Sequence, residues 1–284
     1  MPIKKILLCT DGSQYAEVCC RFAVWLAKRL DGFIESLYVS DIRQFEWPII
    51  ADLSGSLGIQ PYQDAISQLQ ELEKQKATFI RSNTEAIFQD QEFGEQHNFN
   101  HETGILVDCM EKFNSSIDLV MLGKRGENVH LASEHLGSNM ERVIRASKKP
   151  CMVTPRAFQP ISKVLLAYDD SFGSQKALKF LTDSSIFKDL EFHLVTVDET
   201  STGGEVSLTR LKKAEELLCK AGIVPTCQML NGTPEGAIAE YVEAQDISLL
   251  AMGAYGHSRI RRLLIGSTTT ALIRSCHIPV LLMR

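Results

Sequence analysis

The chain contains one motif twice, and each copy is built around glycines. Residues 117–123 (IDLVMLG) and 247–253 (ISLLAMG) are apolar, strand-like runs that end on a glycine, and a second glycine follows three residues later in each copy. A Gly-Ser pair then opens an amphipathic segment, and a proline precedes a last apolar run in both copies. A repeat unit of this length is a whole domain and not one turn of a solenoid. The sequence therefore predicts two tandem domains of the same fold.

The repeat reaches back to the start of each half, where residues 5–13 align with residues 163–171. The copies are 158 residues apart at Asp11 and Asp169 but 130 apart at the first glycines, so the first domain carries about 28 extra residues in its middle. We place the first domain at 1–156 and the second at 157–284, and call them the first and second half. The linker at 155–160 is short, which predicts that the halves pack together.

Composition narrows the classes of function. The chain has 284 residues, of which 44% are hydrophobic and 23% charged, as in soluble globular domains. A net charge of -5 argues against bulk attraction to nucleic acid or an anionic membrane. There is no apolar stretch of about 18 residues for a membrane span, and the N-terminal apolar run is too short for a signal peptide. We expect a cytoplasmic protein with neither nucleic acid nor membrane as a partner.

The eight cysteines are scattered and form no C-x-x-C pair. Most lie inside apolar segments, so they are expected to be small core residues in a reducing compartment. The adjacent pair Cys19 and Cys20 leaves a redox sensor as the alternative.

Short apolar runs alternate with segments of helical period in both halves, which is typical of a parallel sheet wrapped by helices. Continuous apolar residues in the first and fourth strands of each half predict burial on both faces. A long helix at 63–88 is expected to have Ile66, Leu69, Leu72 and Ile80 on one side. The other expected helices are 13–30, 103–114, 138–147, 171–183, 206–221, 233–244 and 267–275. The expected strands are 3–9, 33–39, 119–122, 151–154, 164–167, 193–197, 226–230, 249–252 and 280–283, with a polar stretch at 93–99.

The glycines of the second half have the spacing Gly253-x2-Gly256-x9-Gly266-Ser267-Thr268. The first of them follows a buried strand, at the carboxyl edge where open α/β sheets bind ligands, and glycine lets the backbone come close to a ligand. The last three residues open a helix, where free N–H groups, hydroxyls and the dipole favour an anion. This pattern predicts a phosphate site. The alternative is a pair of turn glycines followed by an ordinary serine N-cap.

Asp169 ends the first strand of the same half and is expected at the same edge of the sheet. A carboxylate there suits hydrogen bonds to ribose hydroxyls or to a base amino group, and not to phosphate. The alternative is a helix N-cap, which the run Asp169-Asp170-Ser171 also satisfies. An anion site and a sugar-type acceptor on one edge together favour a nucleotide.

The order of elements, the aspartate after the first strand and the motif G-x2-G-x9-G-[ST] resemble the universal stress protein family in its tandem two-domain form, over nearly the whole chain. The resemblance implies an α/β fold: two open sheets of five parallel strands with helices on both faces, Rossmann-like and of the adenine nucleotide alpha hydrolase type. It implies that the domains pair as in a dimer. It also implies a stress-response regulator that binds ATP, ADP or AMP, with or without Mg, and signals through partner contacts or assembly. Its protein partners are unknown, and a homodimer is a further expectation.

Carried over residue by residue, the resemblance implies that Asp169 and the backbone at Thr196 and Val197 contact adenosine. The ribose and phosphates would lie against the rest of the site, with the hydroxyl and amide of Ser267 donating to phosphate. These remaining residues are Met252, Gly253, Gly256, Gly266, Ser267 and Thr268. In the intervening loop, His257, Arg259 and Arg261 either reach the terminal phosphate or form a solvated basic loop.

The first half departs from the family pattern. Ten residues instead of nine separate Gly126 from Gly137, and Glu127 adds negative charge beside the expected phosphate position. We therefore expect weaker binding there, or none. The residues of this second site are Asp11, Val39, Gly123, Gly126, Gly137 and Ser138. The insertion at 42–62, with Trp47, Pro48 and Pro61, is expected to cover the site or to contact a partner.

Other catalytic motifs are missing from the sequence: G-x-x-x-x-G-K-[ST], G-x-G-x-x-G and G-x-S-x-G. We expect neither a catalytic residue nor a metal site. His97 and His101 beside Glu102 would suit a metal only on a helix, and Gly94 and several asparagines predict a surface loop there. Two rivals to a regulator remain. One is a weak ATPase or autophosphorylating enzyme, for which the sequence offers no positioned base or metal carboxylate pair; the other is a nucleotide-free interaction scaffold.

Overall fold

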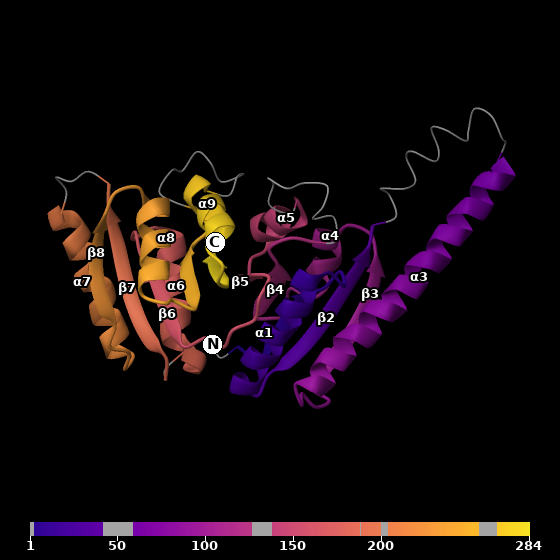
Figure 1. Cartoon of the computed structure of the whole chain (residues 1–284), viewed down its shortest axis with the longest axis horizontal. Helices are drawn as coiled ribbons and strands as arrows, with labels where there is room; N and C mark the ends of the chain where they lie inside the picture. Colours follow the sequence, from indigo (N-terminus) through magenta and orange to yellow (C-terminus); the bar gives the residue numbers. More distant parts are fainter. Residues whose placement is uncertain (1–2, 42–58, 127–137, 188, 200–203, 256–265) are drawn as a thin grey trace.

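The structure is a computed structural model that describes residues 3–41, 59–126, 138–187, 189–199, 204–255 and 266–284 (Figure 1). For residues 59–65, Ser138 and Ser185 it describes the backbone alone. The first half contains β1 (Lys5–Cys9), α1 (Gln14–Leu30), β2 (Phe33–Ser40), α3 (Ile59–Asp90), β3 (His97–Thr103), α4 (Leu106–Glu111), β4 (Leu119–Gly123), α5 (Ser138–Ala146) and β5 (Cys151–Thr154). The second half contains β6 (Lys163–Ala167), α6 (Phe172–Asp183), the 3-10 turn η2 (Ser185–Phe187), β7 (Glu191–Asp198), α7 (Gly204–Lys220), β8 (Thr226–Asn231), α8 (Pro234–Ala244), β9 (Leu249–Gly253), α9 (Ser267–Ser275) and β10 (Val280–Met283).

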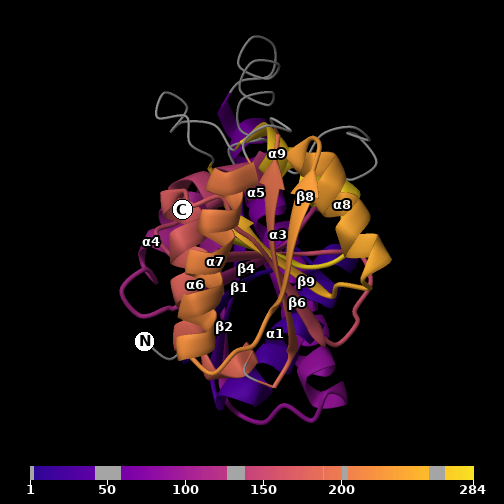
Figure 2. The same ribbon diagram turned by 90° about the vertical axis from the view of Figure 1, so that its left-hand side faces the viewer.

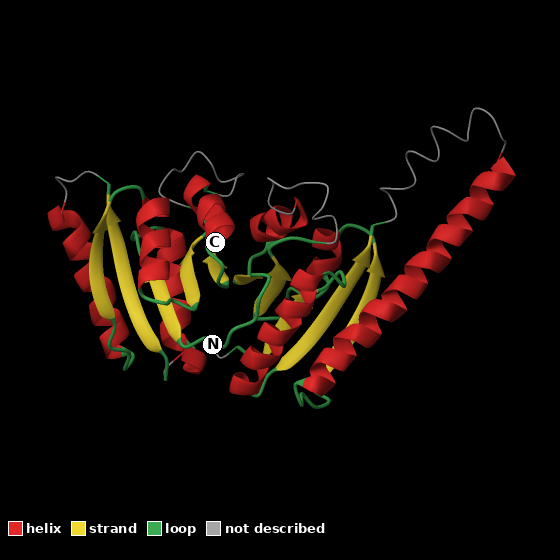
Figure 3. Cartoon of the chain, in the orientation of Figure 1, coloured by secondary structure: helices red, strands yellow, loops and turns green. Residues whose placement is uncertain are grey.

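All these strands join one open sheet, in the order β3-β2-β1-β4-β5-β10-β9-β6-β7-β8 (Figure 3). Neighbouring strands within each half are parallel, which confirms the predicted five-stranded parallel sheets. The halves meet at β5 and β10, which pair antiparallel with Val153 opposite Val280 and Met152 opposite Leu281. The complete sheet is therefore mixed, and its two halves are related like the subunits of a dimer.

Helices cover both faces of the sheet and enclose two apolar layers. Helices α1, α3, α6 and α7 pack on one face, where Phe22, Phe88 and Leu181 are fully buried. Helices α4, α5, α8 and α9 pack on the other face, and each layer contains residues of both halves. Figure 2 shows α6 and α7 on one side of the second half's strands and α8 on the other. Because both layers run through the junction, the halves share one core.

The central strands are buried on both faces, as their continuous apolar residues predicted. The residues of β4 and β9 are buried up to their final glycine, and β1 is buried from Ile6 onward. The outermost strands β3 and β8 alternate between half-buried and exposed residues along most of their length. Their polar side chains suit the edge of a sheet, where unpaired backbone groups must stay in water.

Two expectations for the first half were wrong. The polar segment around residue 99 is not a loop, because His97–Thr103 forms the edge strand β3, in register with β2. The long helix α3 has 32 residues against 17 in its counterpart α7, and it reaches well beyond the sheet in Figure 1. Ile80 is buried on this helix, but Leu72 is 60% exposed, so the four apolar residues do not share one buried side. The insertion at 42–62 therefore ends within α3, and residues 42–58 with Trp47 and Pro48 lie outside the described residues.

The linker packs on α1 of the first half, and α1 also contacts the second half. The Phe158 ring packs edge-on against Phe22 of α1 with centroids 4.7 Å apart, and Arg156 donates to the Gln14 side chain at 2.8 Å. From the same helix, Arg29 donates to the carbonyl of Ile186 in η2 at 2.9 Å. The short linker thus predicted packed halves correctly.

The cysteine pair in α1 is structural. Cys19 and Cys20 are both fully buried, and burial raises the pKa of the Cys19 thiol to about 12 and raises that of Cys20 as well. A thiol reacts as its thiolate, so neither sulfur is prepared for redox chemistry near neutral pH.

Candidate functional site

Asp169 lies just beyond β6, at the carboxyl edge of the second half. Its Oδ1 accepts a hydrogen bond from the Ser171 amide at 3.0 Å. The N-cap of α6 is Ser171 itself, whose hydroxyl accepts from the Ser174 amide at 3.3 Å. In the same way, Oδ1 of Asp11 accepts a hydrogen bond from the Ser13 amide at 3.0 Å, just before α1. Ser171, and not Asp169, is therefore the N-cap of α6. Asp169 stabilises the turn that precedes this cap.

The neighbouring carboxylate has a separate task. Asp170 adopts a left-handed backbone conformation with φ 61°, and it accepts from the Tyr168 hydroxyl at 2.7 Å and from Gln175 at 2.9 Å. The Tyr168 hydrogen bond, helped by Lys213, holds the pKa of the Asp170 carboxyl below its usual range. Asp170 thus has hydrogen-bond partners within the protein on Tyr168 and Gln175.

The first glycine of each motif is required by packing. A Cβ on Gly253 would lie 3.0 Å from the Ser174 nitrogen and 3.2 Å from Gly173, because the first turn of α6 rests on the end of β9. A Cβ on Gly123 would lie 2.7 Å from the Cβ of Tyr15 in α1. The close approach that the sequence assigned to a ligand is thus made by the protein's own helix at these two positions.

The second glycine of the first half lies against the acidic residue of its site. A Cβ on Gly126 would be 2.6 Å from Oδ2 of Asp11, so a larger residue here would displace this carboxylate. The structure therefore brings Asp11, Gly123 and Gly126 to one edge of the sheet. Gly137 and Glu127 lie outside the described residues, and Ser138 opens α5.

Helix α9 begins at the end of β9, as the motif of the second half predicted. Gly266 is its N-cap, and no side chain caps the first turn. The Gly266 amide donates to the Ala254 carbonyl at 3.3 Å, and the hydroxyl of Thr269 bonds the carbonyl of Gly253 at 3.4 Å. Gly253 and the segment Gly266–Thr268 are therefore brought together, with Ser267 exposed and Thr268 half-buried. Gly256, His257, Arg259 and Arg261 lie outside the described residues.

The adjacent strand supplies the remaining predicted residues. Thr196, near the carboxyl end of β7, is 2% exposed, and Val197 beside it is half-buried. The Tyr168 amide donates to the Val195 carbonyl at 2.9 Å, which carries the β6–β7 ladder to the residue before Asp169. Met252 is buried in β9, and Val39 has the place of Val197 in the first half. The backbone contact of Thr196 and Val197 with a ligand stays a prediction.

Two further residues lie at this edge that are not among the predicted site residues. Thr269 fastens α9 to β9 through its buried hydroxyl, and Asp198 is a buried carboxylate at the end of β7. The position of the Thr269 hydroxyl, three residues after Gly266, is a sequence signal that could have identified this residue. Asp198 follows an apolar strand just as Asp169 does, and that parallel was the signal for the second.

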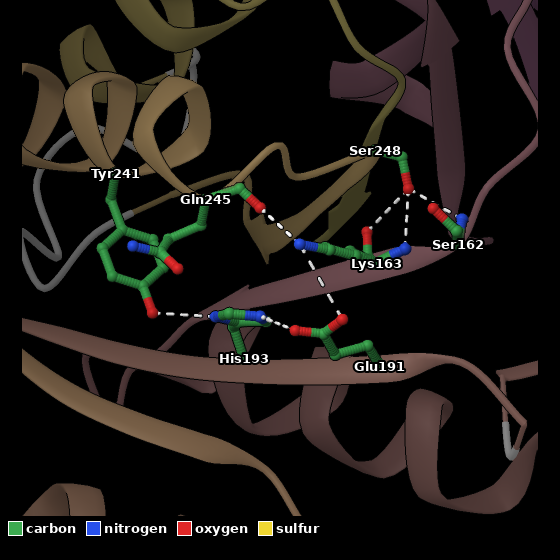
Figure 4. A network of polar contacts seen from close by, with 7 residues as sticks. All are labelled: Ser162, Lys163, Glu191, His193, Tyr241, Gln245 and Ser248. Carbon is green, nitrogen blue, oxygen red and sulfur yellow. Dashed lines mark hydrogen bonds and ion pairs between the residues drawn. The ribbon is translucent and has the colours of Figure 1, made fainter.

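A polar cluster lies at the opposite, amino edge of the second half (Figure 4). His193 on β7 is 2% exposed; its Nδ1 is 2.8 Å from the Tyr241 hydroxyl and its Nε2 is 2.9 Å from Glu191. Lys163 lies 3.8 Å from the other Glu191 oxygen and donates to the Gln245 carbonyl at 3.0 Å. The His193 hydrogen bond holds the pKa of the Glu191 carboxyl below its usual range. These residues connect β6, β7 and α8 at the edge of the sheet opposite the candidate site.

Ser248 adds further hydrogen bonds at the amino edge of the second half. The Ser248 hydroxyl accepts from the amides of Ser162 and Lys163, both at 2.8 Å. The register of the strands puts Glu35 of the first half where the second half has His193. Glu35 binds Lys5 at 2.7 Å and Asn100 at 2.6 Å. Each half thus has a buried polar pair at the same place, and the amino edge has a structural role.

We predict that Tyr241→Phe lowers the free energy of unfolding by about 1–3 kcal/mol, because it leaves a buried nitrogen of His193 without its partner. Urea unfolding followed by circular dichroism measures the change. The matched control is Tyr255→Phe, since the buried Tyr255 hydroxyl has no hydrogen-bond partner among the described residues. Equal losses in both variants would contradict a specific contribution of the His193 bond.

The histidines of β3 do not form a metal site. His101 bonds the Ser40 hydroxyl at 2.8 Å and stacks on Tyr38, while His97 bonds the Gly94 carbonyl at 3.0 Å. Four residues apart on a strand, the two rings are separated by about 13 Å, too far to share an ion. Across the part of the chain that the structure describes, no group of three or more metal-binding side chains occurs. Of the described helices, none is long and apolar enough to cross a membrane.

Comparisons with known proteins agree with this architecture. A model of the universal stress protein family matches the chain twice, over residues 2–155 and 160–284. The universal stress protein Slr1230 of Synechocystis sp. is 45% identical over 288 residues, covering 99% of this chain and 100% of that protein. The crystal structure of a universal stress protein from Archaeoglobus fulgidus DSM 4304 has a TM-score of 0.64 at 23% identity, covering 99% of this chain and 96% of the other. The protein PA1789 of Pseudomonas aeruginosa PAO1, described as functionally unknown, has a TM-score of 0.63 at 15% identity, with 99% and 92% covered. These two structures share the fold.

Proposed function

The chain belongs to the universal stress protein family in a tandem form, as its motifs predicted, and on this basis we propose that it is a stress-response regulator that binds an adenine nucleotide. ATP is the proposed ligand, with ADP or AMP as its close relatives, bound with or without Mg. The site is in the second half. The proposed domains remain 1–156 and 157–284.

One observation carries this proposal: the described residues of the complete motif meet at one edge of the sheet. Gly253 and the start of α9 are joined by hydrogen bonds, and Asp169 follows the neighbouring strand β6. The N-terminus of α9 has a glycine N-cap and no side-chain cap, so its first amides favour an anion such as phosphate. A carboxylate and backbone groups on the adjoining strands suit a ribose and a base.

The proposed contacts follow the family pattern. Asp169 and the backbone at Thr196 and Val197 contact adenosine, and residues at the end of β9 and after it contact the ribose and phosphates. These are Met252, Gly253, Gly256, Gly266, Ser267 and Thr268. The first half keeps Asp11, Val39, Gly123, Gly126, Gly137 and Ser138, but its longer loop and Glu127 weaken binding there.

The nucleotide is proposed to act by changing contacts with protein partners or with a second copy of the chain. A cytoplasmic location fits this role. The paired halves already provide the dimer-like arrangement within one chain. The regulator, the weak enzyme and the scaffold differ in what they do to ATP, so one experiment separates them.

We predict about one adenine nucleotide per chain, because the second half has the complete motif. The freshly purified protein is denatured and the released nucleotide is identified by chromatography and mass and counted, before and after incubation with ATP and magnesium. About two per chain would mean that the first half also binds. No nucleotide even after incubation would contradict the proposal and favour the scaffold.

The same incubation tests the enzyme alternative. ADP that accumulates only with a divalent metal, and not in Asp169→Ala, would favour an ATPase. Phosphate retained covalently on the chain would favour autophosphorylation. Nucleotide recovered as intact ATP supports the regulator.

A further inference from the structure

Lys124 is a buried lysine of the first half that contacts the second half. It follows β4, its amide donates to the Thr154 carbonyl at 3.0 Å, and the residue is 8% exposed. Its ammonium group donates to the carbonyl of Cys276, at the end of α9. No carboxylate of the described residues lies within 4.0 Å of it. Burial removes the hydration of an ammonium group and so opposes folding, which means that packing alone does not account for this residue.

Helix α9 connects this contact to the proposed phosphate site. The helix has nine residues, so its ends are about 13 Å apart. Its N-terminus holds Gly266, Ser267 and Thr268, and its C-terminus is the negative end of the helix dipole, where a cation is favourable. Thr269 binds the first end to β9, and Lys124 binds the second end to β4. The position of the helix along its axis is therefore set from both halves.

The reverse contact exists as well. Arg284, which follows β10 of the second half, donates to the carbonyl of Arg145 near the end of α5. Its guanidinium lies 5.7 Å from the centre of the Tyr255 ring, in the segment that follows β9. Helix α5 is the counterpart of α9 in the first half. Each half thus holds the far end of the other half's motif helix with a cation.

We propose that Lys124 is a positioning residue for the nucleotide site of the second half, acting across the junction by fixing α9. The inference rests on the proposed function. It makes the affinity of one half depend on the other, because Gly126, two residues beyond Lys124, lies against Asp11 at the first half's own site. A ligand that displaces the segment from Lys124 to Gly126 would change the hydrogen bond between Lys124 and the end of α9.

Because the charge of Lys124 depends on pH, the proposal predicts that the affinity for ATP depends on pH as well. Burial lowers the pKa of the ammonium to about 8, while the charge of the Cys276 side chain acts to raise it. Burial raises the pKa of the Cys276 thiol, and the Glu243 carboxylate on α8 raises it further. Between pH 7 and pH 9 the ammonium group loses its charge, and its attraction to the end of α9 weakens. The affinity for ATP should therefore fall over this range, although ATP itself stays ionised.

The test is calorimetric titration of the full chain with ATP at pH 7 and pH 9. We expect Lys124→Met to raise the Kd at pH 7 by about 5–10-fold and to remove the pH dependence, while Lys124→Arg stays within about 2-fold of wild type. Lys148→Met, at an exposed lysine of the same half, is the control and should keep the wild-type affinity and pH profile. Thermal unfolding shows that each variant is folded, and Lys124→Met should not lower the transition temperature.

Each outcome has one meaning. If wild type binds no ATP at either pH, the proposed function fails. If wild type binds but Lys124→Met binds equally well at pH 7, the positioning role is overturned. An affinity of the wild-type chain that is the same at pH 7 and pH 9 overturns it too, and this measurement needs no variant.

Discussion

The substitution Gly266→Val is expected to lower the affinity of the second half for ATP by at least about 100-fold while the chain stays folded. Gly266 is the N-cap of α9, and a branched side chain there would occupy the space in front of the first helical amides. The backbone at this position, with φ -57° and ψ 144°, is one that valine readily adopts. The loss should therefore appear in binding and not in stability. Calorimetric titration with ATP measures it, with thermal unfolding alongside.

The matched control is Gly94→Val. A Cβ on Gly94 would meet no atom within 4 Å, and this glycine lies before β3 in the first half. We expect its ATP affinity to equal that of the wild-type chain. An unchanged affinity in Gly266→Val would show that the phosphate site lies elsewhere. A loss in both variants would point to a general effect on the fold.

The substitution Gly173→Ala is expected to lower the free energy of unfolding by about 3 kcal/mol, because its methyl group would collide with two backbone atoms. A Cβ there would lie 2.8 Å from the Met283 carbonyl oxygen and 2.9 Å from the Cα of Gly253. Neither atom can rotate away as the end of a side chain would. Helix α6 must then move off β9 and β10, so the junction of the halves is affected as well. The midpoint of urea unfolding measures the loss.

Gly236→Ala is the control for this variant, since Gly236 also lies in the first turn of a helix of the second half. A Cβ on Gly236 would meet only the Thr233 hydroxyl at 3.0 Å, which can rotate away. Alanine also favours the helix by up to about 1 kcal/mol relative to glycine. We expect stability equal to or slightly above wild type. Equal losses in both variants would contradict the packing explanation.

Most of the fold could be predicted from the sequence because its signals are local. The apolar runs at β4 and β9 and the repeated glycines identify buried parallel strands and the order of elements. Strand β3 was missed because an edge strand needs no apolar face: it consists of polar residues such as His97, Asn98 and Asn100 around one Phe99. The tendency to form a strand depends on such context more than the tendency to form a helix does.

The described residues of the expected site lie at one edge of the sheet, but the sequence did not predict what each of them contacts. Glycine spacing signals that something comes close to the backbone, but it does not say whether a ligand or a helix does so; at Gly253 it is α6. Contacts between distant residues were beyond sequence reasoning. His193 meets Tyr241 48 positions away, and Lys124 reaches Cys276 across 152 positions, without any pattern that links them.

The antiparallel junction of β5 and β10 frees this protein from a constraint that identical subunits obey. In a symmetric pair, every substitution appears twice, so both sites gain or lose function together. Here one gene product supplies both sides of the junction, and its formation does not depend on protein concentration. The two halves can therefore differ in their loops and charges, as the first half does at Glu127, while the second half has the complete motif.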